Sequence, residues 1–290
     1  MANFFKTTFL LTLLTLLVVF FGFALGGGRG MSIAFCFACV MNFGAYWFSD
    51  KIVLAMHRAQ LLTEDEAPEV FEILRKLSSK AGVPMPRLYM LPSASANAFA
   101  TGRDPKHAAI AVTHGIVGLL NKEELSGVLG HELSHILNYD ILLSSIVATL
   151  AGALSMIASM FRWSFFWGGE RDERDNGHPL ALILISVVMP FVAMLIQLAI
   201  SRSREYGADL GGAKLCEEPL YLSSALRKID AASKRLPLRE AQPATAHLFI
   251  TNPLSGKGWS ALFSTHPPLE DRMARLEAMS LTPKRSEPQL

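Results

Sequence analysis

The chain has 290 residues, 51% of them hydrophobic and only 18% charged, with a positive mean hydropathy. A soluble domain carries roughly a quarter charged residues, and here the shortage is concentrated in a few apolar stretches, as in a membrane protein. The net charge of +2, without a basic cluster, argues against nucleic acid as a partner. The length suits one catalytic domain together with several membrane spans.

Four apolar segments are long enough to cross a hydrocarbon layer of about 30 Å, which takes roughly 20 residues. They cover residues 7–25, 31–48, 141–160 and 180–200. The first is expected to be an uncleaved anchor, because its basic start is weak, its apolar run is long and a second span follows almost at once. Positive side chains follow the second and fourth segments, and such flanks favour the cytoplasmic side: Lys51, Arg58, Arg202 and Arg204.

This pattern divides the chain into four regions and places both halves of the catalytic domain in the cytoplasm. We expect two N-terminal transmembrane helices in 1–50, the first catalytic half in 51–140, two further membrane segments in 141–200 and the second catalytic half in 201–290. A hydrophobic hairpin would serve as well as two full crossings in the third region, because either returns the chain to the side it left.

The first catalytic half reads as a compact α+β unit. A capping box at Thr63 and Glu66 predicts a helix running to Lys80, and 87–91, 96–100 and 108–112 read as short strands separated by turn residues. A second capping signature at Asn121 and Glu124 predicts a helix running to Leu137.

That second helix carries His131-Glu-Leu-Ser-His135. Residues four apart lie on one helical face, so both imidazoles can bind one ion, and neutral histidine is a favoured zinc ligand. Glu132 lies beside the metal, where it can take a proton from a zinc-bound water whose pKa falls towards about 7. A chance occurrence on a surface helix is the alternative, and the apolar residues flanking the motif argue against it.

A catalytic zinc site needs a third protein ligand. Glu205 is the candidate, with Asp209 four residues later on the same helical face to accept the spare N–H of a ligating histidine. An even number of crossings separates His135 from Glu205, so the chain returns to the same side. The alternative is a surface ion pair between Glu205 and Arg202 or Arg204.

Four further residues are candidates for the site. Asp140 either bonds within the site or marks the membrane boundary. Asn97 either holds a substrate carbonyl on an edge strand, where extended peptides add, or is an ordinary turn-proximal residue. A donor is needed for the oxyanion of the tetrahedral intermediate, and a His or an Arg could supply it. His266 is favoured for this role, the alternative being a structural position at the start of a helix. Arg272 is the other candidate to contact substrate.

Three blocks of the sequence are similar to the signature blocks of the HtpX-type bacterial membrane metallopeptidases, relatives of the CAAX prenyl endoprotease: 131–140 (HELSHILNYD), 203–209 (SREYGAD) and 263–268 (FSTHPP). The resemblance covers nearly the whole chain. It implies an endopeptidase of the bacterial inner membrane, with its active site facing the cytoplasm, that degrades misfolded or damaged membrane proteins during envelope stress. It also implies zinc on His131, His135 and Glu205 and a catalytic base at Glu132.

The expected fold is therefore an α-helical integral membrane protein with four hydrophobic segments and an α+β, gluzincin-like zinc metallopeptidase domain. The expected function is zinc-dependent cleavage of proteins at the lipid bilayer. The alternatives are cleavage of prenylated peptides, a metal transporter, and a non-catalytic scaffold or chaperone that keeps zinc for folding. The spans lack the carboxylates and histidines of an ion pathway, and a structural zinc site would need a fourth Cys or His ligand.

Overall fold

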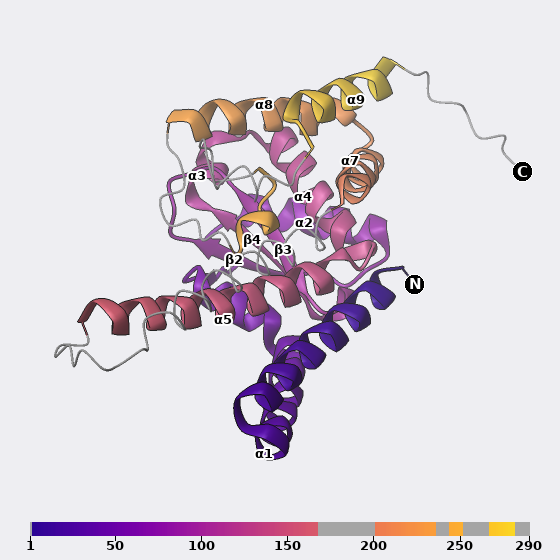
Figure 1. Ribbon diagram of the computed structural model, residues 1–290. Coiled ribbons are helices and arrows are strands. Elements are labelled where there is room, and N and C mark those ends of the chain that lie inside the picture. Colours follow the sequence, from indigo (N-terminus) through magenta and orange to yellow (C-terminus); the bar gives the residue numbers. More distant parts are fainter. Residues whose placement is uncertain (1, 168–200, 236–243, 252–266, 282–290) are drawn as a thin grey trace, which may run out of the picture.

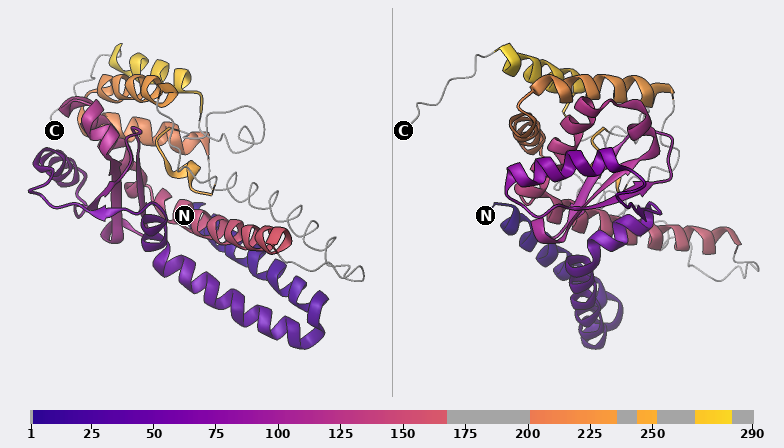
Figure 2. Two further views of the ribbon diagram at one scale, coloured as in Figure 1. Left: turned by 90° about the vertical axis from the view of Figure 1, so that its left-hand side faces the viewer. Right: turned by 180° about the vertical axis from the view of Figure 1, so that it is seen from behind.

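A computed structural model of the chain describes residues 2–167, 201–235, 244–251 and 267–281. A mixed sheet with helices packed against it forms the body. Helices α1 (Ala2–Met56) and α5 (Asp140–Trp167) project together from one side of that body (Figures 1 and 2). The body is the part that builds the site, and the projecting helices contain the apolar segments expected in the first 160 residues.

Helix α1 is a hairpin of two helical arms. The chain leaves helical geometry at Gly26 and Gly27, and Gly27 adopts a positive φ of 58°, which residues without a Cβ adopt readily. The arms then pack closely, because a Cβ on Gly22 would lie 2.6 Å from the carbonyl oxygen of Gly30. Asn42 Nδ2 donates across the pair to Thr15 Oγ1 at 2.7 Å. Polar side chains thus join two otherwise apolar arms.

Within the described ranges, one helix, Gly26–Met56, is long and apolar enough to cross a membrane. The preceding arm, Thr7–Phe20, is a shorter apolar helix, and α4 (Lys122–Leu137) with the start of α5 would qualify as a broken span bent by 89°. The segment expected at 180–200 lies outside the described residues. The expected count of four membrane segments is therefore not confirmed.

The sheet has the strand order β1-β2-β4-β3, with β1 (Gln60–Leu61), β2 (Arg87–Leu91), β3 (Ala98–Gly102) and β4 (Ala108–Thr113). Strand β2 runs parallel to β4, whereas β1 and β3 pair antiparallel to their neighbours. The strands expected at 87–91 and 108–112 are present, and the third begins two residues later than expected, at Ala98. Strand β3 is an edge strand and lies against α4 and α5.

Helices enclose one main core around α4. The apolar faces of α2 (Pro68–Ala81) and α8 (Pro219–Arg235) pack against α4, which itself lies against β3, with Leu74, Leu129 and Leu226 fully buried. Helix α7 (Arg202–Cys216) packs along α4, and α9 (Leu269–Leu281) lies beside α8 (Figure 1). The short helices α3 (His114–Leu119), η1 (Pro105–His107) and η2 (Ala246–Leu248) complete the described fold.

The two expected capping boxes differ in outcome. At Asn121 the box is complete: its Oδ1 accepts from Glu124 N at 2.8 Å, and Glu124 Oε2 accepts from Asn121 N at 3.1 Å. At Thr63 both the backbone N–H and the hydroxyl bond to the Glu66 carboxylate, and α2 begins later, at Pro68. The residues Thr63 to Glu66 therefore form a turn instead of a helix start, because the Thr63 hydroxyl bonds to a side chain and not to a helix N–H.

Candidate metal centre

The buried face of α4 presents the two histidines. His131 and His135 lie one helical turn apart with ring centroids at 4.7 Å, and both His131 and the intervening Glu132 are almost fully buried. The capped start of α4 and its packing between α2, α7 and α8 hold this face in place. Two imidazoles at this spacing can approach one ion from the same side.

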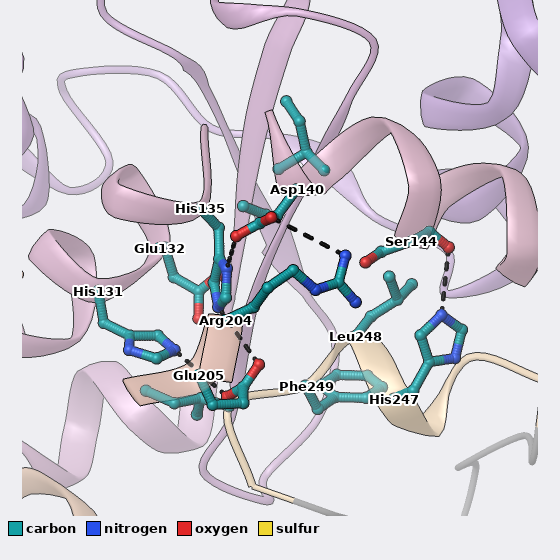
Figure 3. A pocket seen from close by; sticks show the side chains of 13 residues that line it. His131, Glu132, His135, Asp140, Ser144, Arg204, Glu205, His247, Leu248 and Phe249 are labelled. Carbon is teal, nitrogen blue, oxygen red and sulfur yellow. Dashed lines mark hydrogen bonds and ion pairs between the residues drawn. The ribbon is translucent and has the colours of Figure 1, made fainter. Parts of the chain in front are cut away.

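Helix α7 brings Glu205 to the same point. The helices approach closely through glycines, since a Cβ on Gly212 would lie 2.7 Å from the backbone nitrogen of His131. Glu205 Oε2 is 3.9 Å from His131 Nε2, and Glu205 Oε1 is 3.6 Å from His135 Nε2. One ligand atom from each of the three residues falls within 4.8 Å of the others (Figure 3).

Each histidine is oriented by its own carboxylate. His131 Nδ1 lies 2.9 Å from Asp209 Oδ1, and His135 Nδ1 lies 3.0 Å from Asp140 Oδ2. Asp140 reaches back because Tyr139 adopts a left-handed φ of 57°, which turns the chain sharply between α4 and α5. With N–H groups donated to carboxylates, both Nε2 lone pairs are left for a metal.

Arg272 on α9 completes the support on the His131 side. It is fully buried, and its Nε and Nη2 bond to the two oxygens of Asp209 at 2.9 and 2.7 Å. Its Nη1 donates to the carbonyl of Ile250 at 2.9 Å. The structure thus places this candidate substrate contact behind Asp209, with its donors used inside the protein.

Burial sets unequal charges on the residues of the site. It lowers the pKa of His131 to about 4, against the hydrogen bond to Asp209, and raises the pKa of Glu132 to about 7. Burial also works to lower the pKa of His135, but the hydrogen bond to Asp140 and the Glu205 charge raise it to about 9. Burial would raise the pKa of Asp209, yet the Arg272 charge holds it at about 2.

This donor set fits one divalent cation. Two imidazole nitrogens and one carboxylate oxygen converge, each imidazole is fixed through its other nitrogen, and Glu132 lies between the two histidines in the chain. Catalytic metal sites of hydrolases have this form, three protein ligands with an open position. The residues expected to form the site from the sequence are therefore close enough in space to do so.

The surrounding pocket is small, with a volume of about 30 Å³. Strand β3 forms one wall, where the Ala100 backbone N–H donates to the Glu132 carboxylate. The end of η2 and the two residues after it form another wall, through Leu248, Phe249 and Ile250. Ile250 N donates to the Ala98 carbonyl at 3.0 Å, so this segment pairs with the outer edge of β3.

The remaining candidates lie in different surroundings. Asn97 is buried just before β3, and its Nδ2 donates to the carbonyl of Thr251 at 3.1 Å. His266 lies outside the described residues. His247, which was not among the expected site residues, lines the pocket and donates from Nε2 to the Ser144 carbonyl at 3.2 Å (Figure 3). No local pattern marks His247, because the fold alone brings η2 to α5.

Known proteins are similar to this chain over most of its length. Residues 64–280 match peptidase family M48. A "Protease HtpX homolog" of Syntrophobacter fumaroxidans is 53% identical over 282 residues, covering 96% of this chain and 100% of that protein. Another of Pyrococcus furiosus is 49% identical over 276 residues, covering 95% and 96%. The similarity to these relatives therefore extends over almost the whole chain.

The fold is shared with a solved structure. The crystal structure of S. mikatae Ste24p aligns with a TM-score of 0.52 and 18% identity, covering 95% of this chain and 66% of that one. At this identity the likeness concerns the fold alone. Taken with the close relatives and the match over 64–280, it leads to one conclusion. The chain belongs to peptidase family M48, among metalloproteases of the HtpX type.

Proposed function

We propose that the chain is a membrane-embedded, zinc-dependent endopeptidase with His131, His135 and Glu205 as metal ligands and Glu132 as the catalytic base. The observation that carries the proposal is the convergence of these three ligand side chains within 4.8 Å, with Asp209 and Asp140 holding the two imidazoles. Zinc is the expected ion because its catalytic sites combine histidine and carboxylate ligands with one open position. Asp209 and Asp140 act by orienting the ligands.

Glu132 is suited to moving a proton. When bound, the metal would polarise the scissile carbonyl and acidify water. The Glu132 carboxylate, held by the Ala100 N–H, would take a proton from the attacking water and later pass it to the leaving amine. Burial raises the pKa of Glu132 to about 7, which suits a group that must both accept and return a proton near neutral pH.

We infer a membrane setting and protein substrates for this activity. Gly26–Met56 is apolar, and only 11% of its most apolar stretch is buried in the protein, which leaves a lipid-facing surface. The positive residues after the second and fourth apolar segments favour an active site on the cytoplasmic side of the bacterial inner membrane. Misfolded or damaged membrane proteins, cut during envelope stress, are the substrate class that the resemblance to HtpX-type peptidases suggests.

The test compares the wild type with Glu132→Gln and Glu205→Ala, each purified in detergent and incubated with a destabilised membrane protein. Glu132→Gln should keep zinc and lose cleavage, because it removes the base and leaves every ligand. Glu205→Ala should lose both zinc and cleavage. Wild-type cleavage should stop with a chelator and return with added zinc. Full zinc content in Glu205→Ala would refute that ligand.

A zinc-containing scaffold or chaperone without peptidase activity is the other function to be separated. Zinc bound equally by wild type and Glu132→Gln, with no fragments from either across several unfolded substrates, would favour that reading. Peptides with and without a prenyl group, tested side by side, would show whether lipidated substrates are preferred.

A further inference from the structure

The side chain of Arg204 brings a guanidinium into the active-site pocket with two of its nitrogens unmatched. Nε and Nη1 are both buried, and neither has a hydrogen-bond partner within the described parts of the chain. The nearest acid is Asp140, whose Oδ1 lies 3.8 Å from Nη1, an ion-pair distance too long for a hydrogen bond. Figure 3 shows this group beside His135, between Asp140 and Leu248.

Buried donors without acceptors are rare, because a charged group removed from water loses hydration that only new hydrogen bonds restore. The Arg204 side chain is only 14% exposed, so solvent does not supply those bonds to Nε and Nη1. Both atoms belong to a residue that lines the pocket containing His131, Glu132, His135 and Glu205. An acceptor brought by a bound substrate would complete them.

Arg272 offers an internal comparison. It too is buried near the ligands, with Glu205 Oε2 at 3.9 Å from its Nη1, but its donors are bonded to Asp209 and to the Ile250 carbonyl. Arg272 therefore has little left to offer a substrate. Arg204 has the same charge and free donors on the His135 side of the pocket.

We propose that Arg204 is a substrate-binding residue that holds a main-chain carbonyl oxygen of the peptide next to the scissile bond. A neutral acceptor is favoured over a terminal carboxylate, because Asp140 already balances the guanidinium charge and Glu132 and Glu205 line the same pocket. An internal carbonyl is also what an endopeptidase must grip. This inference rests on the proposed peptidase function and names a contact that function requires.

The experiment uses full-length protein in detergent, with Arg204→Met, Arg204→Lys and the control Arg202→Met. Arg202 is exposed in the same turn of α7, so its loss tests charge at this end of the helix without touching the pocket. Arg204→Met should raise KM about tenfold or more with kcat little changed, as expected for a lost charged hydrogen bond present throughout the reaction. Arg204→Lys should fall between, because it keeps the charge and loses the fork.

Zinc content and thermal midpoint separate binding from structure. Both should stay at wild-type values in Arg204→Met, and Arg202→Met should match the wild type in every readout. Loss of zinc in Arg204→Met, or an unchanged KM, would overturn the inference. Loss of zinc would mean that Arg204 acts by holding Asp140 and, through it, His135.

A binding measurement keeps this result separate from that of the proposed chemistry. A fluorescein-labelled unstructured peptide, with free or amidated C-terminus, is titrated against zinc-loaded Glu132→Gln and Glu132→Gln/Arg204→Met. Weaker binding to the double variant for both peptides supports a main-chain carbonyl contact even if no cleavage is ever seen. A loss restricted to the free-acid peptide would refute it in favour of a terminal carboxylate, and equal or absent binding would refute any substrate contact.

Discussion

His131 and His135 lie one turn apart on α4 and face the same carboxylate, yet their surroundings shift their pKa values in opposite directions. Burial lowers the pKa of His131 to about 4, so it is neutral at pH 7. The hydrogen bond to Asp140 and the charge of Glu205, acting against burial, raise the pKa of His135 to about 9, so its imidazole is protonated. The proton on His135 thus supplies positive charge next to Glu205, at the place where a bound metal would supply it.

Metal binding is therefore expected to release this proton. At about pH 8, where Glu132 is already ionised and His135 is not yet neutral, zinc binding should displace the His135 proton in addition to any proton lost from metal-bound water. The share from His135 should fall as pH rises through about 9. Calorimetric titration in buffers of different ionisation enthalpy counts the protons. Asp140→Asn, which removes the negative charge that helps to raise the pKa of His135, should release fewer, and zero release from the wild type at that pH would contradict the assignment.

Arg272 makes the second prediction at this scale. Arg272→Met leaves the Asp209 carboxylate buried without its cation, and breaking such a pair typically costs about 3–5 kcal/mol in the free energy of unfolding. His131 would also lose its fixed orientation, so zinc affinity should fall. Thermal unfolding and zinc titration measure the two effects. Arg275→Met is the matched control, because Arg275 is exposed and stacks on the ring of Tyr206, with its Cζ 3.8 Å from the ring centre.

Among the elements, the α1 hairpin depends on one close approach. A Cβ on Gly22 would meet both the Gly30 carbonyl, at 2.6 Å, and the Cβ of Ala34, so Gly22→Ala must push the arms apart. Forced overpacking of this kind costs about 1–3 kcal/mol. Gly44→Ala is the control in the other arm of α1, since its Cβ would meet nothing within 4 Å. Thermal midpoints in one detergent should fall for Gly22→Ala alone; equal midpoints would mean that the arms can separate freely.

Helix α4 shows what the sequence predicts well at this scale. Asn121 and Glu124 form the expected cap, and the four-residue spacing of His131 and His135 fixes their common face, because both are local properties of a helix. The similar pattern at Thr63 predicted a helix start, but the helix begins later, at Pro68. The Thr63 hydroxyl bonds to the Glu66 side chain and so does not cap a helix. Spacing alone does not distinguish these two uses of one motif.

For the molecule as a whole, contacts between residues far apart in the sequence are harder to predict than those within one helix. Glu205 was predicted as the third ligand because its spacing to Asp209 and the even number of crossings both pointed back to α4, and its side chain does lie near His131 and His135. The fold brings His247 and Phe249 to the same pocket through the packing of η2 against α5 and β3, which leaves no local trace. Arg204 was visible as a charge, but its role depends on burial, which sequence does not state.

The pocket wall formed by Leu248, Phe249 and Ile250 has a consequence for how the pocket can change shape. Ile250 donates its N–H to the Ala98 carbonyl of β3 and accepts from Arg272 on α9, so this wall is held from two sides. Widening of the pocket on this side would break one of these two hydrogen bonds. Because Arg272 also holds Asp209, which orients His131, a movement of this wall would be transmitted to one of the proposed metal ligands.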